Sequence, residues 1–300
     1  MSRYCTYLRI NKTTVRLVIF PILKLVLAIH GIRNKLYLVT SDQNPIVLCF
    51  SGLDPSGGAG IMADMEAISS QGALCAPIIT AATVQDTQDV MSFAPMPADL
   101  IIEQARAVLE DMPISVIKIG MVGSAEIAQA IHTILMDYPD IKVVYDPVFS
   151  TEKDGALSTP ELPSVVRTML LPHTTILTPN LFEVHQLAPG SDTPAAAAIG
   201  LLESDVDYIL LTGTHGKTSD VVHILYSGSR ELKRYHYERL PHKYHGSGCT
   251  LASSLAALLA TSNEIESAVG QALDYTHKTL VHGKRIGMGQ FHPNRFFWMK

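Results

Sequence analysis

A cysteine lies at the predicted start of a helix, directly after a turn of small residues. Gly246, Ser247, Gly248 and Cys249 precede the alanine- and leucine-rich stretch 251–260. The first amides of a helix lack partners within it, and with the helix dipole they stabilise phosphate oxygens and favour a thiolate over a thiol. The pattern therefore predicts an anion hole beside a cysteine base. Alternatively, the glycines only shape a loop, and Cys249 is a small buried hydrophobic residue.

Three carboxylates are candidates for binding a ligand. Asp64 is predicted in the first turn of an apolar helix, where it can stabilise the helix dipole or bind a hydroxyl or amine. Asn180 stands three residues before Glu183, which is the spacing of a capping box. The alternative is that Glu183 and Asp146 hold a magnesium ion near nucleotide phosphates, because Mg²⁺ prefers a few carboxylates together with phosphate oxygens.

A glycine-rich loop at residues 52–60 follows the first predicted strand. It lacks both the Gly-Lys-Ser/Thr of a Walker A loop and the Gly-x-Gly-x-x-Gly spacing of a Rossmann fingerprint. Its glycines would still allow the backbone to approach a ligand closely. A tight strand-to-helix connection explains the same glycines without a ligand.

The elements that must position these residues alternate along the chain from residue 45, which is typical of βα units around a mostly parallel sheet. Strands are predicted at 46–50, 76–83, 116–119, 143–146, 175–177 and 208–212, and an antiparallel pair at 221–226 and 231–238. Helices are predicted at 61–71, 98–111, 125–137, 160–170, 195–202, 249–261 and 264–281. Ligands of such sheets bind outside the carboxyl ends of the parallel strands, so we expect the site at that rim.

Composition excludes several classes of protein. With 300 residues and 47% hydrophobic content, the chain is long enough for one large α/β domain and too apolar for disorder. A net charge of −5 without a basic, aromatic-rich face argues against nucleic-acid binding. The four cysteines, Cys5, Cys49, Cys75 and Cys249, show no Cys-x-x-Cys pair, which argues against zinc and fits a reducing compartment.

Residues 1–44 differ in pattern from the rest of the chain. An apolar run at 17–29 follows several basic residues, as in a signal peptide or a short membrane anchor. Pro21 and Lys24 interrupt the run, it is shorter than the ~20 residues of a membrane span, and no small-x-small cleavage pattern follows. We therefore expect an N-terminal extension that is an apolar tail, a membrane-associated helix, or the product of a start assigned upstream of the true one, near Val39. Residues 45–300 would form the main domain, without stable membrane association.

Several motifs occur together in one order. They are Gly-Leu-Asp-Pro-Ser-Gly-Gly-Ala-Gly-Ile at 52–61, Asp64, Gln85, Lys-Ile-Gly-Met at 118–121, Thr-Pro-Asn at 178–180 with Glu183, and His-Gly-Ser-Gly-Cys-Thr at 245–250. Each motif is weak alone, but the set is specific. Across about residues 45–290 the chain closely resembles the hydroxymethylpyrimidine/phosphomethylpyrimidine kinases of the thiamine pathway, which are part of the ribokinase-like superfamily.

The resemblance implies an α/β, ribokinase-like three-layer fold in which helices lie on both faces of a mostly parallel central sheet. It also implies a kinase that uses ATP and Mg²⁺ to phosphorylate hydroxymethylpyrimidine and then its monophosphate, giving the diphosphate for thiamine biosynthesis. Members of this family are commonly homodimers. The ATP requirement and the free thiols together predict a cytoplasmic location.

The resemblance also implies roles for individual residues. Cys249 would be the base, and the amides of Gly246, Ser247, Gly248 and Cys249 would form the anion hole. The residues implied for the pyrimidine pocket are Gln85, Asp64, Gly52 and Met121. Those implied for the nucleotide are Asn180, Thr212 and Gly213, and those for magnesium are Glu183 and Asp146.

Three positions depart from the family pattern. Thr-Gly-Thr-His at 212–215 stands where the family commonly has Lys-Gly-Gly-His, so a nucleotide-contacting lysine is missing unless Lys153 or Lys217 substitutes for it. Asp86 follows Gln85 where asparagine is usual, and residues 150–155 match the family's phosphate-side flap poorly. Two alternatives therefore remain open, which are a pyridoxal kinase and a pyrimidine-binding module without catalysis.

Overall fold

The computed structural model describes residues 44–149, 157–204, 206–213, 219–261 and 264–299, together with four strands closer to the N-terminus. The chain divides into two units, residues 1–44 and 45–300. In the first unit, β1 (Cys5–Ile10) pairs antiparallel with β2 (Thr13–Val18), and β3 (Val26–Ile29) pairs antiparallel with β4 (Leu36–Val39). Where it is described, this segment forms two hairpins and not the helix that was one of the three expectations.

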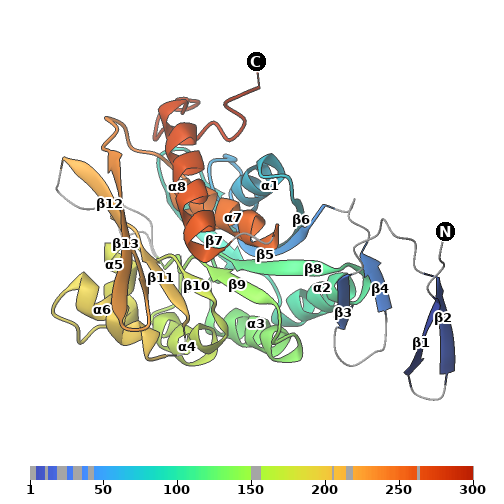
Figure 1. Ribbon diagram of the computed structural model, residues 1–300. Coiled ribbons are helices and arrows are strands. Elements are labelled where there is room, and N and C mark those ends of the chain that lie inside the picture. The colour runs from blue at the N-terminus through green and yellow to red at the C-terminus, as the bar shows by residue number, and fades with distance from the viewer. Residues whose placement is uncertain are drawn as a thin grey trace. The chain divides into compact units, whose positions relative to one another are not determined.

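Within the described residues of the second unit, nine strands form one sheet in the order β13-β12-β11-β10-β9-β8-β5-β6-β7 (Figure 1). The parallel strands are β5 (Ile46–Leu53), β6 (Leu74–Gln85), β8 (Ile114–Ile119), β9 (Lys142–Tyr145), β10 (Ile176–Leu177) and β11 (Tyr208–Leu211). Helices cover both faces of these strands, so their residues are apolar in continuous runs rather than in alternation. Each of these six parallel strands lies where an apolar run in the sequence predicts a strand.

Antiparallel strands close both edges of the sheet. β12 (Asp220–Ser227) and β13 (Arg230–Glu238) form the hairpin expected around Gly228. β7 (Val90–Pro95), which pairs with β6 at the other edge, was not predicted. Its side chains are largely exposed and it contains a proline, so it lacks the buried apolar run that marks the central strands.

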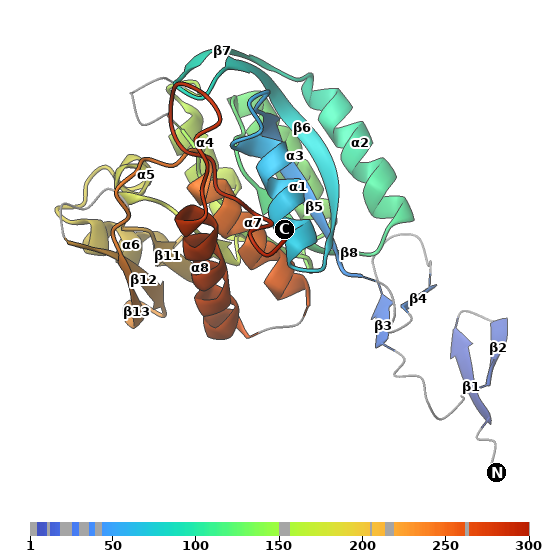
Figure 2. The ribbon, with the colours of Figure 1, turned by 90° about the horizontal axis from the view of Figure 1, so that it is seen from above.

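Helices lie on both faces of the sheet (Figures 1 and 2). One layer consists of α1 (Gly60–Ser70), α7 (Ser247–Ala260) and α8 (Ile265–Val281), and the other of α2 (Ala98–Asp111), α3 (Ala125–Asp137), α4 (Leu162–Met169), α5 (Leu181–Leu187) and α6 (Pro194–Leu202). A short 3₁₀ helix (Leu171–His173) follows α4. Each layer has its own buried apolar cluster against the sheet, which is the three-layer arrangement that the family resemblance implies. None of the helices in the described residues is long and apolar enough to cross a membrane.

The strand order places a topological switch point at β5. The chain leaves β5 through α1 to reach β6 on one side, but β8, on the other side of β5, leads into α3 on the opposite face of the sheet. The connections that follow β5 and β8 therefore diverge. In open parallel sheets, ligands bind at this kind of switch point, outside the carboxyl ends of the strands.

Candidate active site

The ends of β5 and β8 lie against each other. A Cβ added to Gly52 would be 2.8 Å from Met121 Sδ, so these two residues are in contact. Gly60 begins α1 with a φ of +59°, and a Cβ there would overlap the carbonyl oxygen of Gly52. The glycines thus allow the loop at 52–60 to fold back over the end of its strand. Two residues expected in the pyrimidine pocket, Gly52 and Met121, are brought together.

Asp54 fixes the shape of this loop and joins it to the segment before α7. Its carboxylate accepts hydrogen bonds from the amides of Ser56 at 2.7 Å and Ala59 at 2.8 Å, and it lies 2.8 Å from His245 Nε2. Burial would raise the pKa of Asp54, but His245 and the loop donors outweigh it and lower the pKa to about 2. The glycine loop and the anion-hole motif are therefore held side by side.

A buried ion pair underlies the loop. Lys118 Nζ lies 3.0 Å from each carboxylate oxygen of Asp64, and Ser253 Oγ donates to Asp64 Oδ1 at 2.6 Å. Each of these residues is 0% exposed. Burial would lower the pKa of Lys118, but the charges of Asp64, Cys249 and Asp146 outweigh it and raise the pKa, so the ammonium remains charged. One charge cluster thus links β8, α1 and α7.

The expected placement of Asp64 in the first turn of its helix is wrong. The helix α1 begins at Gly60, one residue before the predicted start, so Asp64 lies beyond its first turn and has no free helix amide to serve. Its carboxylate is directed at Lys118 in the interior. Asp64 is therefore first of all the counter-ion of a buried lysine, and a direct contact with a ligand stays a proposal.

The start of α7 has the form expected of an anion hole. Gly246 is its N-cap, with a left-handed φ of +83°, and no side chain caps this helix. The amide of Thr250 bonds to the carbonyl of Gly246 at 3.0 Å, whereas within the described part of the chain the amides of Ser247, Gly248 and Cys249 bond to no other protein group. Three N–H groups are thus available to an anion.

The expectation that Cys249 favours a thiolate in the resting protein is wrong. Burial raises its pKa, and the carboxylates of Asp64 and Asp146 add to that effect. Lys118 and the Gly60 amide, which donates to the sulfur, lower the pKa but are outweighed, and the result is a pKa of about 12. The helix dipole alone would favour the thiolate, but other elements bring two carboxylates to the sulfur.

Asp146 and Glu183 form a pair of buried carboxylates. Burial raises the pKa of Asp146 to about 6, and burial together with the charge of Asp146 raises that of Glu183 well above its usual value. Asp146 Oδ2 is buried without a hydrogen-bond partner among the described residues. A Cβ on Gly248 would be only 3.6 Å from that oxygen, so Asp146 borders the anion hole.

The pair fits a magnesium ion in charge and in donor type. The pKa values of both carboxyl groups are raised, and one Asp146 oxygen has no partner among the described residues. A bound cation would compensate the negative charge of the two carboxylates. The described residues hold no group of three or more His, Cys, Asp or Glu side chains that could bind a metal. A cation at Asp146 and Glu183 would therefore take its other ligands from phosphates and water. The capping-box interpretation of Glu183 also holds, since its Oε2 accepts from the Asn180 amide at 2.8 Å.

The residues expected at the nucleotide have structural partners. Asn180 Oδ1 accepts from the amides of Phe182 and Glu183 at the start of α5, and Asn180 forms an isolated parallel bridge with Thr212. A Cβ on Gly213 would overlap the carbonyl oxygen of Val222, so this glycine permits close packing on β12. Asn180 and Thr212 are thus adjacent, as a shared ligand would require. Residues 150–156 and 214–218, with Lys153, His215 and Lys217, lie outside the described residues.

Gln85 is the last residue of β6 and lines a cavity of about 390 Å³. The lining also includes Ser56 of the glycine loop. Residues 286–288, which come from the C-terminal segment, complete the lining. This contribution is not predictable from the sequence, because nothing in the C-terminal segment indicates where it returns to the sheet.

Sequence reasoning also missed Asp54 and Ser253, and it assigned no role to Lys118. A lysine within the apolar strand Ile-Ser-Val-Ile-Lys-Ile was a usable signal, because a fully buried lysine requires a charged partner. For the contacts of Asp54 with His245 and of Ser253 with Asp64 no comparable signal exists, since the two residues of each contact are distant in sequence.

Residues 54–294 match the family model described as phosphomethylpyrimidine kinase. The chain belongs to this kinase family. It is 36% identical over 269 residues to a bifunctional thiamine-biosynthetic enzyme of Arabidopsis thaliana, with 85% of this chain and 51% of the plant enzyme covered. It thus spans about half the length of that relative. To the hydroxymethylpyrimidine/phosphomethylpyrimidine kinase of Streptomyces coelicolor it is 34% identical, with 82% of this chain and 92% of the bacterial protein covered.

Solved structures of this kinase family and of pyridoxal kinases share the fold. The phosphomethylpyrimidine kinase of Clostridium difficile is 30% identical with a TM-score of 0.69, covering 79% of this chain and 100% of that one. A Staphylococcus aureus pyridoxal kinase, solved with AMP-PCP and pyridoxal, is 24% identical with a TM-score of 0.76, covering 84% and 94%. The predicted family and its ribokinase-like α/β fold are thereby confirmed.

Proposed function

We propose that this chain uses ATP to phosphorylate hydroxymethylpyrimidine and then the resulting monophosphate, giving the diphosphate for thiamine biosynthesis. The observation that carries the proposal is the start of α7, where three unpaired amides adjoin Cys249 and Asp146 at the switch point of the sheet. The family match and the similarity to the hydroxymethylpyrimidine/phosphomethylpyrimidine kinase of Streptomyces coelicolor support this substrate.

The chemistry requires alignment more than covalent catalysis. A transferred phosphoryl group passes through a loose transition state with charge on its equatorial oxygens, which preorganised N–H donors stabilise. The amides of Ser247, Gly248 and Cys249 would bind those oxygens. Gln85 would pair with the edge of the pyrimidine, and Gly52 and Met121 would flank its ring. Asn180, Thr212 and Gly213 would form the nucleotide side.

Asp146 and Glu183 would hold magnesium, which when bound supplies positive charge to the phosphates. A cation there would also compensate the charge of Asp146, which is one of the two carboxylates that raise the pKa of Cys249, and the pKa of Cys249 would fall. Lys118 would then stabilise the thiolate, and Cys249 could accept the proton of the substrate hydroxyl. The monophosphate in the second step is already an anion and needs no base.

The test is incubation of the full-length protein with ATP, Mg²⁺ and hydroxymethylpyrimidine, followed by mass analysis. We expect first the monophosphate and then the diphosphate, and neither product without ATP. Pyridoxal is the rival acceptor, because pyridoxal kinases share this fold. If pyridoxal is phosphorylated with a higher kcat/KM than the pyrimidine, or if no pyrimidine phosphate forms, the proposed substrate is wrong.

Assembly and location stay predictions. We propose a homodimer in the cytoplasm, in line with the family resemblance and with the free thiols of Cys49, Cys75 and Cys249. Light scattering of the purified protein measures its oligomeric state, and fractionation of the native cell measures its location.

A further inference from the structure

Arg295, in the C-terminal segment, is buried behind the anion hole at 2% exposure. Its Nε donates to Thr250 Oγ1 at 2.9 Å, and its Nη1 donates to Glu66 Oε2 at 3.0 Å. Its Nη2 donates to the carbonyl oxygen of Gly58. The three partners belong to α7, α1 and the glycine loop, so one guanidinium joins three segments that are distant in sequence.

The contact with Thr250 continues to the helix N-cap. Thr250 Oγ1 accepts from Arg295 and donates its own proton to the carbonyl oxygen of Gly246 at 2.7 Å. A Cβ on Gly246 would lie 2.9 Å from Arg295 Nη2 and would overlap the carbonyl oxygen of Gly58. The guanidinium therefore packs against both glycines and sets the orientation of the peptide that precedes the free amides.

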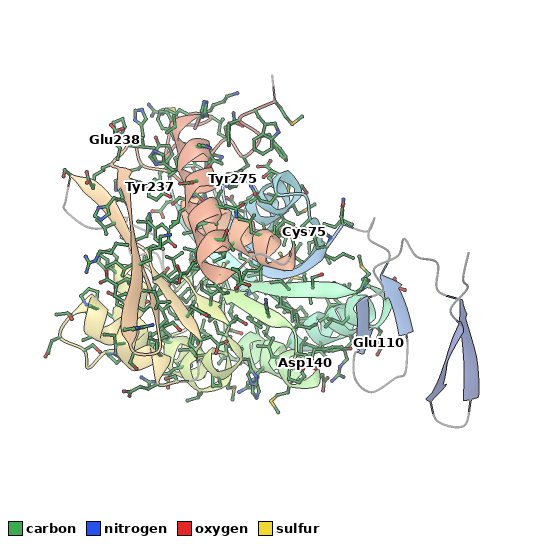
Figure 3. The ribbon with its side chains drawn as sticks, in the orientation of Figure 1. Cys75, Glu110, Asp140, Tyr237, Glu238 and Tyr275 are labelled. Atoms are coloured by element: carbon green, nitrogen blue, oxygen red, sulfur yellow. The ribbon has the colours of Figure 1, made fainter. Side chains whose placement is uncertain are left out.

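The protein holds Arg295 in place from α8. Tyr275, labelled on α8 in Figure 3, donates its hydroxyl proton to the Arg295 carbonyl oxygen at 3.0 Å. The Asn294 amide donates to the Thr279 carbonyl at 2.9 Å. The side chain of Glu66 is 40% exposed, so water screens its charge more than that of the guanidinium. Positive charge therefore remains close to the turn that precedes the anion hole.

We propose that Arg295 is a positioning residue for phosphoryl transfer. It fixes the distance between the glycine loop and the first turn of α7, and it adds positive potential behind the amides of Ser247, Gly248 and Cys249. This inference rests on the anion-binding role proposed above for α7. In this proposal Arg295 touches neither the acceptor nor the nucleotide. It acts through its contact with Gly58 and through Thr250, which in turn bonds to Gly246.

The experiment compares full-length Arg295→Gln, Arg295→Lys and Thr250→Val with the control Arg106→Gln, which removes an exposed arginine paired with Asp137. Two quantities are measured. The first is kcat and KM for the pyrimidine. The second is protection of Cys249 by inorganic phosphate against iodoacetamide, followed by peptide mass analysis. The second needs no assumption about the acceptor.

For Arg295→Gln we expect kcat to fall about 100-fold with little change in the KM for the pyrimidine, as for a small misplacement of catalytic groups. Protection of Cys249 should require roughly tenfold more phosphate. Thr250→Val keeps the arginine but breaks its link to Gly246, so it should lower kcat in the same direction. Arg295→Lys keeps the charge but loses the forked geometry, and we expect an intermediate loss. Arg106→Gln should match the wild type.

The outcomes separate this inference from the proposed function. If folded Arg295→Gln and Thr250→Val bind phosphate and turn over like the wild type, Arg295 is only structural and the inference is wrong. If Arg295→Gln does not fold, the same two measurements on Arg295→Lys and Thr250→Val test the inference. Wild-type kinetics and wild-type phosphate protection in both variants would then show that it is wrong. If the wild type does not phosphorylate the pyrimidine but Arg295→Gln and Thr250→Val both need more phosphate than the wild type and Arg106→Gln to protect Cys249, the substrate is wrong and the inference holds.

Discussion

The protonation of Cys249 depends on residues from three other elements. Asp64 on α1 and Asp146 after β9 raise its pKa, and Lys118 on β8 lowers it. Each of these charges acts in a buried place, where water screens it poorly. A change at any one of them should therefore alter the reactivity of the thiol without touching it.

Burial is the main cause that raises the pKa of Cys249 to about 12, and Asp146→Asn removes one of the two carboxylates that add to it. The pKa should fall, so the thiolate fraction at a given pH should rise and the pH profile of alkylation should move to lower pH. We expect iodoacetamide to label Cys249 roughly three- to tenfold faster at pH 8. Peptide mass analysis measures the rate, with the free and partly exposed Cys75 as internal reference. An unchanged profile would contradict the assigned electrostatics.

Cys249→Ala should damage the first phosphorylation more than the second. Loss of a base costs about 10²–10⁴-fold in a step that must remove a proton from a hydroxyl, whereas a phosphate acceptor needs no such help. Separate kcat/KM values for the pyrimidine and its monophosphate measure the difference, with Cys75→Ala as control. Equal losses in the two steps would exclude Cys249 as the base.

At the scale of elements, one glycine decides how α7 begins. Gly246 combines a positive φ with a close approach to the carbonyl oxygen of Gly58. Any side chain there would push the glycine loop away from the helix. The anion hole therefore requires contact between the glycine loop at 52–60 and the turn before α7. Neither segment forms the anion hole without the other.

Gly246→Ala should destabilise the protein by about 1–2 kcal/mol for the left-handed conformation alone, with a further cost for the overlap. It should also lower kcat, because the first amides of α7 would move. Gly200 is the matched control, since it lies inside α6 with no atom within 4 Å of an added Cβ. Gly200→Ala should stabilise the protein by roughly 0.5–1 kcal/mol. Denaturant titration gives both values, and a neutral Gly246→Ala would show that the loop adapts.

At the scale of the molecule, all candidate site residues fall in the second unit. They come from positions between Gly52 and Arg295, and the unit at 45–300 contains both large apolar clusters. We propose that this unit is the complete kinase domain.

Deletion of residues 1–44 should therefore leave the Tm of the main unfolding transition and the kcat/KM for the pyrimidine unchanged. Calorimetry and the kinase assay test this, with the full-length chain as reference. A lowered Tm or a lost activity would show that the N-terminal unit contributes to the domain.

Most of the fold follows from local patterns that can be read in the chain. The parallel strands, the β12–β13 hairpin and the helices were predicted because buried runs, alternation and caps are features of neighbouring residues. The cap at Asn180 and the placement of Cys249 in the first turn of α7 belong to the same class. The edge strand β7 escaped prediction because its stability comes from pairing with β6 and not from a pattern of its own.

The sequence by itself therefore determined the elements, their order, and the motifs that the family shares. Only the tertiary structure decided that Asp64 pairs with Lys118, that burial and two carboxylates raise the pKa of Cys249, and that Arg295 bonds to Thr250 behind the anion hole. The physical reason is that hydrophobic patterns and helix caps involve residues close in sequence. The energy of a charge depends instead on its burial and on its distance from other charges, and the folded chain sets both through contacts between residues far apart in sequence.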